Sequence, residues 1–258
     1  MPRHPLPSPL SLLQSAWRFY RKQSVLTSVW IWLLLLPLFA NTLISHEMNP
    51  VEGEYIWDKE WIAPSVLALL ILGVLILWGE ACILLVGKRM LQHKAGRTRT
   101  SLRAVCRQAR KYIVPLILTS ILRACYTLLW SLLLVIPGII YTLRTIFFAI
   151  VVVAEGKAYR PALHSSIAMM RKRTMRVLLR LIGTAILVFV IPIAIDLLLN
   201  QSATASMMPL ATAVALVHAA VWSFASLLYT LSLVALYAYL KEHTQVFEEY
   251  KPEKIEKE

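Results

Sequence analysis

The stretch IAPSVLALLILGVLILWGEACILLVG (Ile62–Gly87) contains a single acidic or basic side chain, that of Glu80. The hydrocarbon core of a bilayer is about 30 Å thick, so a helix that crosses it needs about 20 mainly apolar residues. A helix also satisfies its own backbone hydrogen bonds where no water is present. This stretch therefore predicts a transmembrane helix.

The two flanks of this stretch carry opposite charges. The segment 45–61 contains the acidic residues Glu47, Glu52, Glu54, Asp58 and Glu60 against one cation, Lys59. The segment 88–111 contains no acid and is rich in cations: Lys88, Arg89, Lys94, Arg97, Arg99, Arg103, Arg107, Arg110 and Lys111. Because cytoplasmic loops of membrane proteins retain Lys and Arg, we expect the second segment inside and the first outside.

Similar apolar stretches recur along the chain and predict further spans: 25–44, 113–136, 138–154, 178–199 and 209–240. The basic segments before the first and fifth spans fall on the same side as residues 88–111, and the uncharged segment 200–208 falls on the other. We thus predict an all-α, polytopic membrane helical bundle with six transmembrane helices and both termini in the cytoplasm. Residues 1–24 form an amphipathic N-terminal segment, 25–240 the six-span domain and 241–258 a charged tail.

The composition agrees with a membrane protein. Of the 258 residues, 58% are hydrophobic and 16% are charged, and the mean hydropathy is +0.64. The net charge is +13, and the lysines and arginines that produce it cluster between the apolar stretches. This arrangement favours anionic lipid headgroups rather than nucleic acid as the partner. The cysteines Cys82, Cys106 and Cys125 are odd in number and form no C-x-x-C pair, so we expect neither a disulfide framework nor a zinc site.

Spans three and four are joined by Pro137-Gly138. Proline removes a backbone donor and glycine accepts turn conformations, so this dipeptide predicts either a tight hairpin turn or a kink in one long element. Residues 113–154 are too many for one span, and we favour the hairpin.

An Arg-x-x-Arg pair lies before each odd-numbered span, which suggests a threefold repeat of an interfacial helix followed by two spans. The alternative is that basic segments beside the membrane are common to all such proteins. On the repeat interpretation, short amphipathic interfacial helices precede spans 1, 3 and 5. Their cations are predicted to contact anionic headgroups: Arg18, Arg21, Lys22, Arg107, Arg110, Lys111, Arg173 and Arg176.

Five ionisable residues are predicted within the spans: Glu80, Arg123, Arg144, Asp196 and His218. Charges in a membrane are costly, face the bundle interior and seek partners. From their depth we expect Glu80 to pair with Arg123, and Arg144 with Asp196. These pairs would either lock the helices together or line a polar pathway. We interpret His218 as a hydrogen-bonded core residue rather than a metal ligand.

The sequence contains no Gly-rich phosphate loop, H-E-x-x-H, G-x-S-x-G or Asp-rich metal motif. We therefore predict no catalytic residue, metal or cofactor.

Several short motifs resemble a bacterial family. They are Pro137-Gly138-Ile-Ile-Tyr141, Arg144-x-x-Phe147, Val151-Val-Val-Ala-Glu155-Gly156 and Ala162-Leu163-x-x-Ser166. Together with Trp17-Arg18-Phe19-Tyr20-Arg21-Lys22, they are similar to YciC-like proteins and to the membrane domain of glycerophosphoryl diester phosphodiesterases. The resemblance implies a six-span protein of the bacterial inner membrane. It transfers no catalytic residue, since the phosphodiesterase catalytic domain is absent here.

Three functions are compatible with these features. The first is a non-enzymatic protein that binds or organises lipids, or supports a membrane complex with another protein or a second copy. The second is a small transporter or permease subunit with the intramembrane charges along its path. The third, which we favour least, is a membrane-embedded enzyme that acts on lipid.

Overall fold

The computed structural model describes residues 6–47, 59–91, 101–170, 174–202 and 208–249. These ranges contain helices and no strand, which confirms the all-α prediction. In chain order the elements are α1 (Pro9–Lys22), α2 (Ser24–Val29), the π-helical segment η1 (Trp30–Leu35), α3 (Leu36–Glu47), α4 (Lys59–Leu91), α5 (Leu102–Leu133), α6 (Val135–Arg144), α7 (Phe148–Glu155), α8 (Tyr159–Met170), α9 (Thr174–Ser202) and α10 (Met208–Glu249).

The described residues contain six helical stretches that are long and apolar enough to cross a membrane. Their bounds are Ser24–Ile44, Ala63–Leu91, Leu102–Leu133, Val135–Glu155, Thr174–Leu198 and Thr212–Glu242. Each corresponds to a predicted span, so the chain is a multi-pass α-helical membrane protein. The fourth stretch is made of α6 and α7, which are separated by a short turn.

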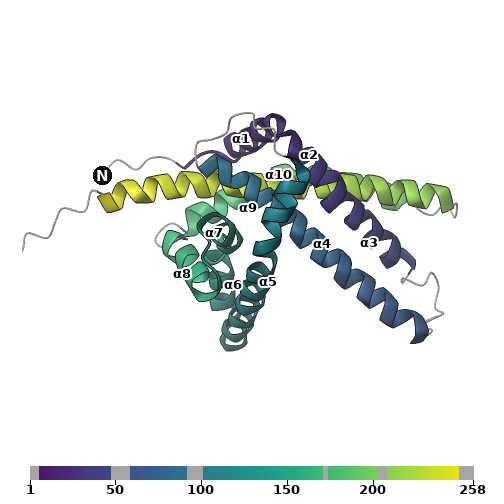
Figure 1. Ribbon diagram of the computed structural model, residues 1–258, viewed down its shortest axis with the longest axis horizontal. Helices are drawn as coiled ribbons and strands as arrows, with labels where there is room; N and C mark the ends of the chain where they lie inside the picture. The colour runs from purple at the N-terminus through teal and green to yellow at the C-terminus, as the bar shows by residue number, and fades with distance from the viewer. Residues whose placement is uncertain (1–5, 48–58, 92–100, 171–173, 203–207, 250–258) are drawn as a thin grey trace, which may run out of the picture.

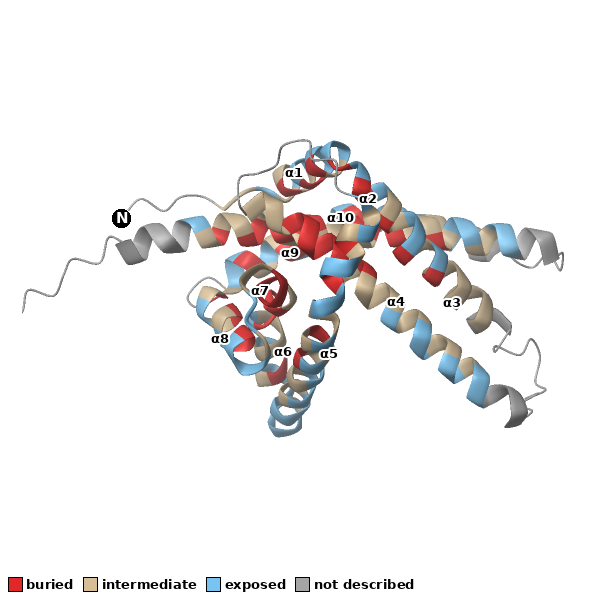
Figure 2. Ribbon diagram, viewed as in Figure 1, coloured by how far each residue is buried: buried red, intermediate tan, exposed pale blue. Residues whose placement is uncertain are grey.

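The core lies where α4 packs against α10, near the middle of the molecule (Figures 1 and 2). Within α4, residues 81–87 are buried on every side. A Cβ on Gly87 would lie 3.2 Å from a methyl carbon of Val234 on α10, so the small residue allows the two helices to approach closely. Leu231 and Tyr237 of α10 are fully buried in the same region.

The first span is irregular and packs closely on α4. The Leu36 N–H donates to the Ile31 carbonyl, five residues earlier, which is the spacing of a π-helical turn. Pro37 follows directly and has no N–H to continue the normal ladder. A Cβ on Gly79 of α4 would lie 2.8 Å from the Leu33 carbonyl oxygen, so only glycine fits here without a shift of backbone.

Helices α5 and α6 pack side by side as a hairpin that projects away from the core (Figure 1). The helical backbone is interrupted at Leu134, whose φ and ψ are −160° and 136°. Pro137 and Gly138, which we expected to form the turn, lie instead in the first turn of α6. Proline is tolerated there because the first N–H groups of a helix have no partner within the helix. Gly138 serves close packing, since a Cβ would overlap the Ser131 hydroxyl of α5.

The three predicted interfacial helices differ in the structure. The first is a separate helix, α1. The second is not separate, because the basic residues after Ser101 form the first turns of the long helix α5. The third predicted segment, 165–176, covers the end of α8 and the start of α9, with residues 171–173 outside the described part of the chain. Helix α10 also continues past residue 240, so the predicted tail begins as an extension of the sixth span.

Candidate functional site

Helix α1 presents an apolar face to the core and a cationic face to its surroundings. Ser8 caps its N-terminus by accepting a hydrogen bond from the Ser11 N–H (3.2 Å). Leu12, Ala16 and Phe19 are buried at the helical spacing of i, i+4 and i+7. The exposed cations of this helix, which we call the α1 cluster, are Arg18, Arg21 and Lys22.

Aromatic contacts fix the orientation of α1. The ring of Phe224 on α10 makes edge-to-face contacts with Trp17 and Tyr20, at centroid distances of 6.2 and 5.5 Å. A hydrogen bond from α4 holds the junction between α1 and α2. The Arg89 guanidinium of α4 donates to the side-chain oxygen of Gln23, which is buried at this junction (3.1 Å). The cationic face of α1 is therefore held in a fixed orientation relative to the spans.

A second group of exposed cations lies at the start of α5. Val105 and Ala109 are buried, whereas the cations around them are exposed; we call these the α5 cluster: Arg103, Arg107, Arg110 and Lys111. The first turn of α5 contains no acidic residue. The partial positive charge of a helix N-terminus adds to these side chains, so this surface favours anions.

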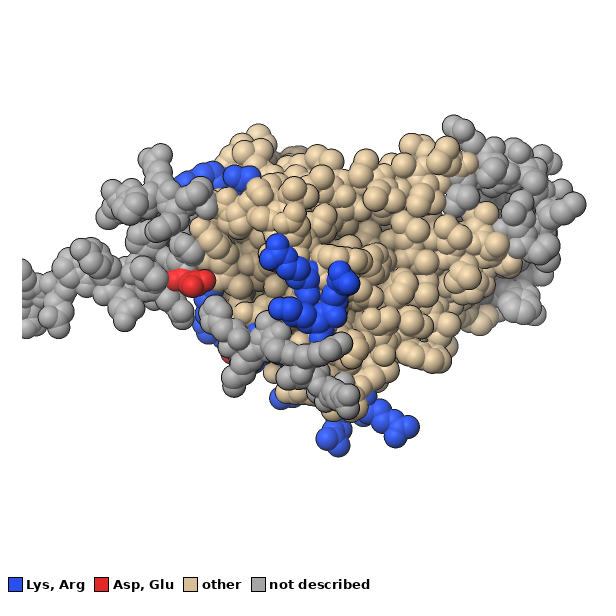
Figure 3. All heavy atoms as spheres, turned by 90° about the horizontal axis from the view of Figure 1, so that it is seen from above, with Lys and Arg blue, Asp and Glu red and all other residues tan. Residues whose placement is uncertain are grey.

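The third predicted set of cations is only partly described. Arg176 is exposed on α9, and Arg173 lies outside the described residues. Figure 3 shows lysine and arginine side chains over the left and middle of the drawn face, whereas its right part carries no charge among the residues shown in colour. We call the part of the molecule that carries the α1 cluster, the α5 cluster and Arg176 the basic end.

The first predicted ion pair is wrong. Arg123 donates from Nε to the Thr145 hydroxyl (3.0 Å) and from Nη2 to the Thr142 carbonyl oxygen (3.1 Å). Its guanidinium also lies 5.0 Å from the centre of the Phe148 ring. These contacts give the guanidinium hydrogen-bond acceptors between the two arms of the hairpin, and Arg123 therefore ties α5 to the end of α6.

Glu80, the expected partner of Arg123, forms no ion pair with any residue of the described ranges. It lies on α4 directly before the buried stretch 81–87 and is itself only partly exposed.

The second predicted ion pair is also wrong. Asp196 of α9 contacts two side chains of α10: its Oδ1 lies 2.7 Å from Nδ1 of His218, and its Oδ2 accepts from the Trp222 indole N–H (2.6 Å). His218 is therefore hydrogen-bonded, as expected, with Asp196 as its partner, but its side chain is 37% exposed and does not lie in the core. Arg144 is exposed at the end of α6 and forms no ion pair within the described part of the chain.

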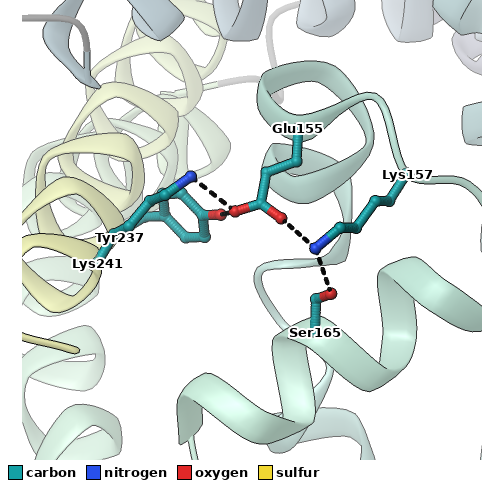
Figure 4. A network of polar contacts seen from close by, with 5 residues as sticks. All are labelled: Glu155, Lys157, Ser165, Tyr237 and Lys241. Carbon is teal, nitrogen blue, oxygen red and sulfur yellow. Dashed lines mark hydrogen bonds and ion pairs between the residues drawn. The ribbon is translucent and has the colours of Figure 1, made fainter. Parts of the chain in front are cut away.

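Glu155, to which the sequence pattern assigned no role, lies at the centre of a network of polar contacts (Figure 4). Its Oε1 accepts from the Tyr237 hydroxyl and from Lys241 Nζ, both at 2.8 Å, and its Oε2 lies 2.9 Å from Lys157 Nζ. Lys157 also donates to the Ser165 hydroxyl of α8 (3.3 Å). The carboxylate thus links α7, α8 and α10 at the basic end.

Two local features accompany this network, but neither of them pairs Glu155 with α10. Gly156 ends α7 in the left-handed conformation, with φ of 72°, and this directs the chain back toward α8. Tyr237 and Lys241 are four residues apart and therefore share one face of α10.

No family model, no curated protein and no solved structure matches this chain. The described residues contain no cluster of three or more His, Cys, Asp or Glu side chains able to hold a metal ion. Function is therefore inferred from the geometry of the basic end.

Proposed function

We propose that this chain is a bacterial inner-membrane protein that binds and organises anionic phospholipids through the cationic faces of α1 and α5. The proposal places the basic end and both termini in the cytoplasm, as the distribution of Lys and Arg between the spans predicts. The proposal also includes that the chain belongs to the YciC-like group, which the motifs in α6, α7 and α8 suggest.

One observation supports this function above the others. The α1 cluster is exposed on a helix whose opposite face is buried against the spans, so these cations stay beside the membrane rather than in bulk water. A Lys or Arg close to an anionic leaflet contributes about 1 kcal/mol of binding free energy. Trp17, which is 43% exposed, is suited to the headgroup layer, where amphipathic rings are enriched.

The test is lipid selectivity of the purified chain in nanodiscs that contain phosphatidylglycerol and phosphatidylcholine. Replacing Arg18, Arg21 and Lys22 together with Gln is expected to lower the enrichment of phosphatidylglycerol around the protein, and the loss should be larger at low ionic strength. The control is a double variant, Gln14→Ala and Ser15→Ala, which changes the exposed face of α1 without changing its charge. Unchanged enrichment in the charge variant would contradict the proposal.

The alternative function is a small transporter, and one observation favours it. Asp196 and His218 form a carboxylate–imidazole pair between two spans, and such pairs occur in proton relays. Proteoliposomes that contain a pH-sensitive dye distinguish the two functions. Proton flux that disappears with Asp196→Asn supports transport, whereas no flux above that of empty vesicles supports the lipid-binding function alone.

A further inference from the structure

A small cavity opens at the basic end between the last turns of α4 and the first turns of α5. Its volume is about 250 Å³. The lining residues come from both helices: Leu85, Val86, Lys88, Arg89, Val105 and Gln108.

The chemistry of this lining divides the cavity into two parts. Leu85, Val86 and Val105 are buried and form an apolar wall. Lys88 and Arg89 supply two positive charges, and Gln108 adds an amide at the exposed side. Among the described residues that line it, none is acidic. Two cations beside an apolar wall are suited to an anion attached to an apolar body.

The two cations are held differently. Arg89 is oriented by its hydrogen bond to Gln23, which is fully buried at the junction of α1 and α2. Lys88 is half-buried and forms no ion pair with a residue in the described ranges. An anionic ligand would stabilise the ammonium group in this position, because it would replace the interactions with water that partial burial removes.

We infer that this cavity binds the phosphate of one glycerophosphate group, with Lys88 and Arg89 on the phosphate oxygens and Gln108 on a glycerol hydroxyl. The inference rests on the proposed function, because it takes phosphatidylglycerol of the cytoplasmic leaflet as the source of that group. Basic pockets between transmembrane helices on the cytoplasmic side are sites of headgroup recognition. The cavity is smaller than the roughly 300–1,000 Å³ of sites for drug-sized ligands, so it fits a headgroup and leaves the acyl chains along the helices.

The experiment measures the lipid that remains bound to the purified chain by native mass spectrometry. We expect one phosphatidylglycerol per chain to survive at detergent concentrations that remove the others. Lys88→Gln should weaken this binding at least fivefold, and Gln108→Leu at least twofold. Arg160→Gln makes the same charge change on an exposed residue of α8 and should leave the bound lipid in place. Gln108 is exposed, so its variant reports on the cavity even if Lys88→Gln impairs folding.

Competition identifies the source of the phosphate. Displacement of the retained lipid by short-chain phosphatidylglycerol, and not by soluble glycerol 3-phosphate, supports a lipid ligand. Displacement by both at similar concentrations supports the same phosphate site with a water-soluble ligand and overturns the lipid source. Retention that neither Lys88→Gln nor Gln108→Leu weakens overturns the site.

These results are separable from those of the nanodisc experiment. Loss of the single retained lipid in Lys88→Gln concerns the cavity, whereas loss of general phosphatidylglycerol enrichment in the α1 variant concerns the proposed function.

Discussion

The α4–α10 core and the α5–α6 hairpin are both built from apolar helices, yet they differ strongly in burial. Leu231 of α10 is fully buried, whereas Leu132 near the tip of the hairpin is 87% exposed. In Figure 2 the buried residues concentrate where α10 crosses α4, and the far part of α5 is mostly exposed. Hydropathy therefore identifies a helix that belongs in a membrane, but it does not say whether protein or lipid surrounds that helix.

The reason lies in residue size and in polar contacts. Gly79 and Gly87 let α4 approach its neighbours closely, and dispersion contacts then accumulate over many atoms. The hairpin lacks such contacts on its outer faces. Its two arms are joined by the close approach at Gly138, by the hydrogen bonds of Arg123 and by the ring contact between Tyr126 and Tyr141. Single substitutions are therefore expected to change the free energy of unfolding by different amounts in the two regions.

The largest expected effect is that of Leu231→Ala. Removing this buried side chain leaves a cavity in the core and should lower the free energy of unfolding by about 2–5 kcal/mol. Leu132→Ala makes the same chemical change on the hairpin, where lipid fills the space, and should cost less than about 0.5 kcal/mol. Reversible unfolding in mixed detergent–SDS micelles measures both. An equal cost for the two variants would mean that another chain covers the hairpin.

The next effect is that of Glu155→Gln. The neutral amide loses its ionic contacts with Lys157 and Lys241, and hydrogen bonds to charged groups contribute about 1.5–3 kcal/mol. We expect a loss in that range, because this network links α7 and α8 to Tyr237 and Lys241 of α10. Glu242→Gln removes an exposed carboxylate of α10 and is the control. If both variants unfold alike, the network contributes nothing.

A smaller effect is expected of Gly79→Ala. The new Cβ would meet the Leu33 carbonyl oxygen at 2.8 Å, and overpacking of this kind costs about 1–3 kcal/mol. Gly73→Ala on the same helix meets no atom within 4 Å and should be neutral or slightly stabilising, since alanine favours helices. Thermal unfolding in detergent compares them. A stable Gly79→Ala variant would contradict the close packing of the first two spans.

The smallest effect is that of Trp222→Phe, which removes one donor from Asp196. Side-chain hydrogen bonds between membrane helices contribute about 0.6 kcal/mol on average and about 1.7 kcal/mol at most, so we expect a loss in that range. Trp32→Phe changes an indole that is 60% exposed and should have no measurable effect in the same unfolding experiment. A loss well above this range would assign Asp196 a larger structural role.

The six spans were predictable because their length and apolarity follow directly from the thickness of the bilayer. The two ion pairs were not predictable, because depth gives only one coordinate of a side chain. Whether Asp196 faces α6 or α10 depends on the rotation of α9 about its axis and on which helix is its neighbour. In the structure the neighbour is α10, which places His218 and Trp222 beside the carboxylate.

The turn of the hairpin and the Glu155 network were missed for a different reason. Pro137-Gly138 is a strong local turn signal, but proline is equally suited to the first turn of a helix, and here the backbone breaks three residues earlier, at Leu134. Glu155 and Tyr237 are separated by 82 residues. Only the packing of α7 against the rest of the fold brings them together, and no periodicity within one helix reports it.

The most direct test of this account is the side of the membrane on which the basic end lies. In intact bacterial cells that express single-cysteine variants on a background without Cys82, Cys106 and Cys125, a membrane-impermeant maleimide should label a cysteine at position 54, in the acidic segment. It should label one at position 107, in the α5 cluster, only after the cells are opened. Labelling at position 107 in intact cells, together with protection of position 54, would place the cationic faces on the wrong side of the membrane and contradict the account.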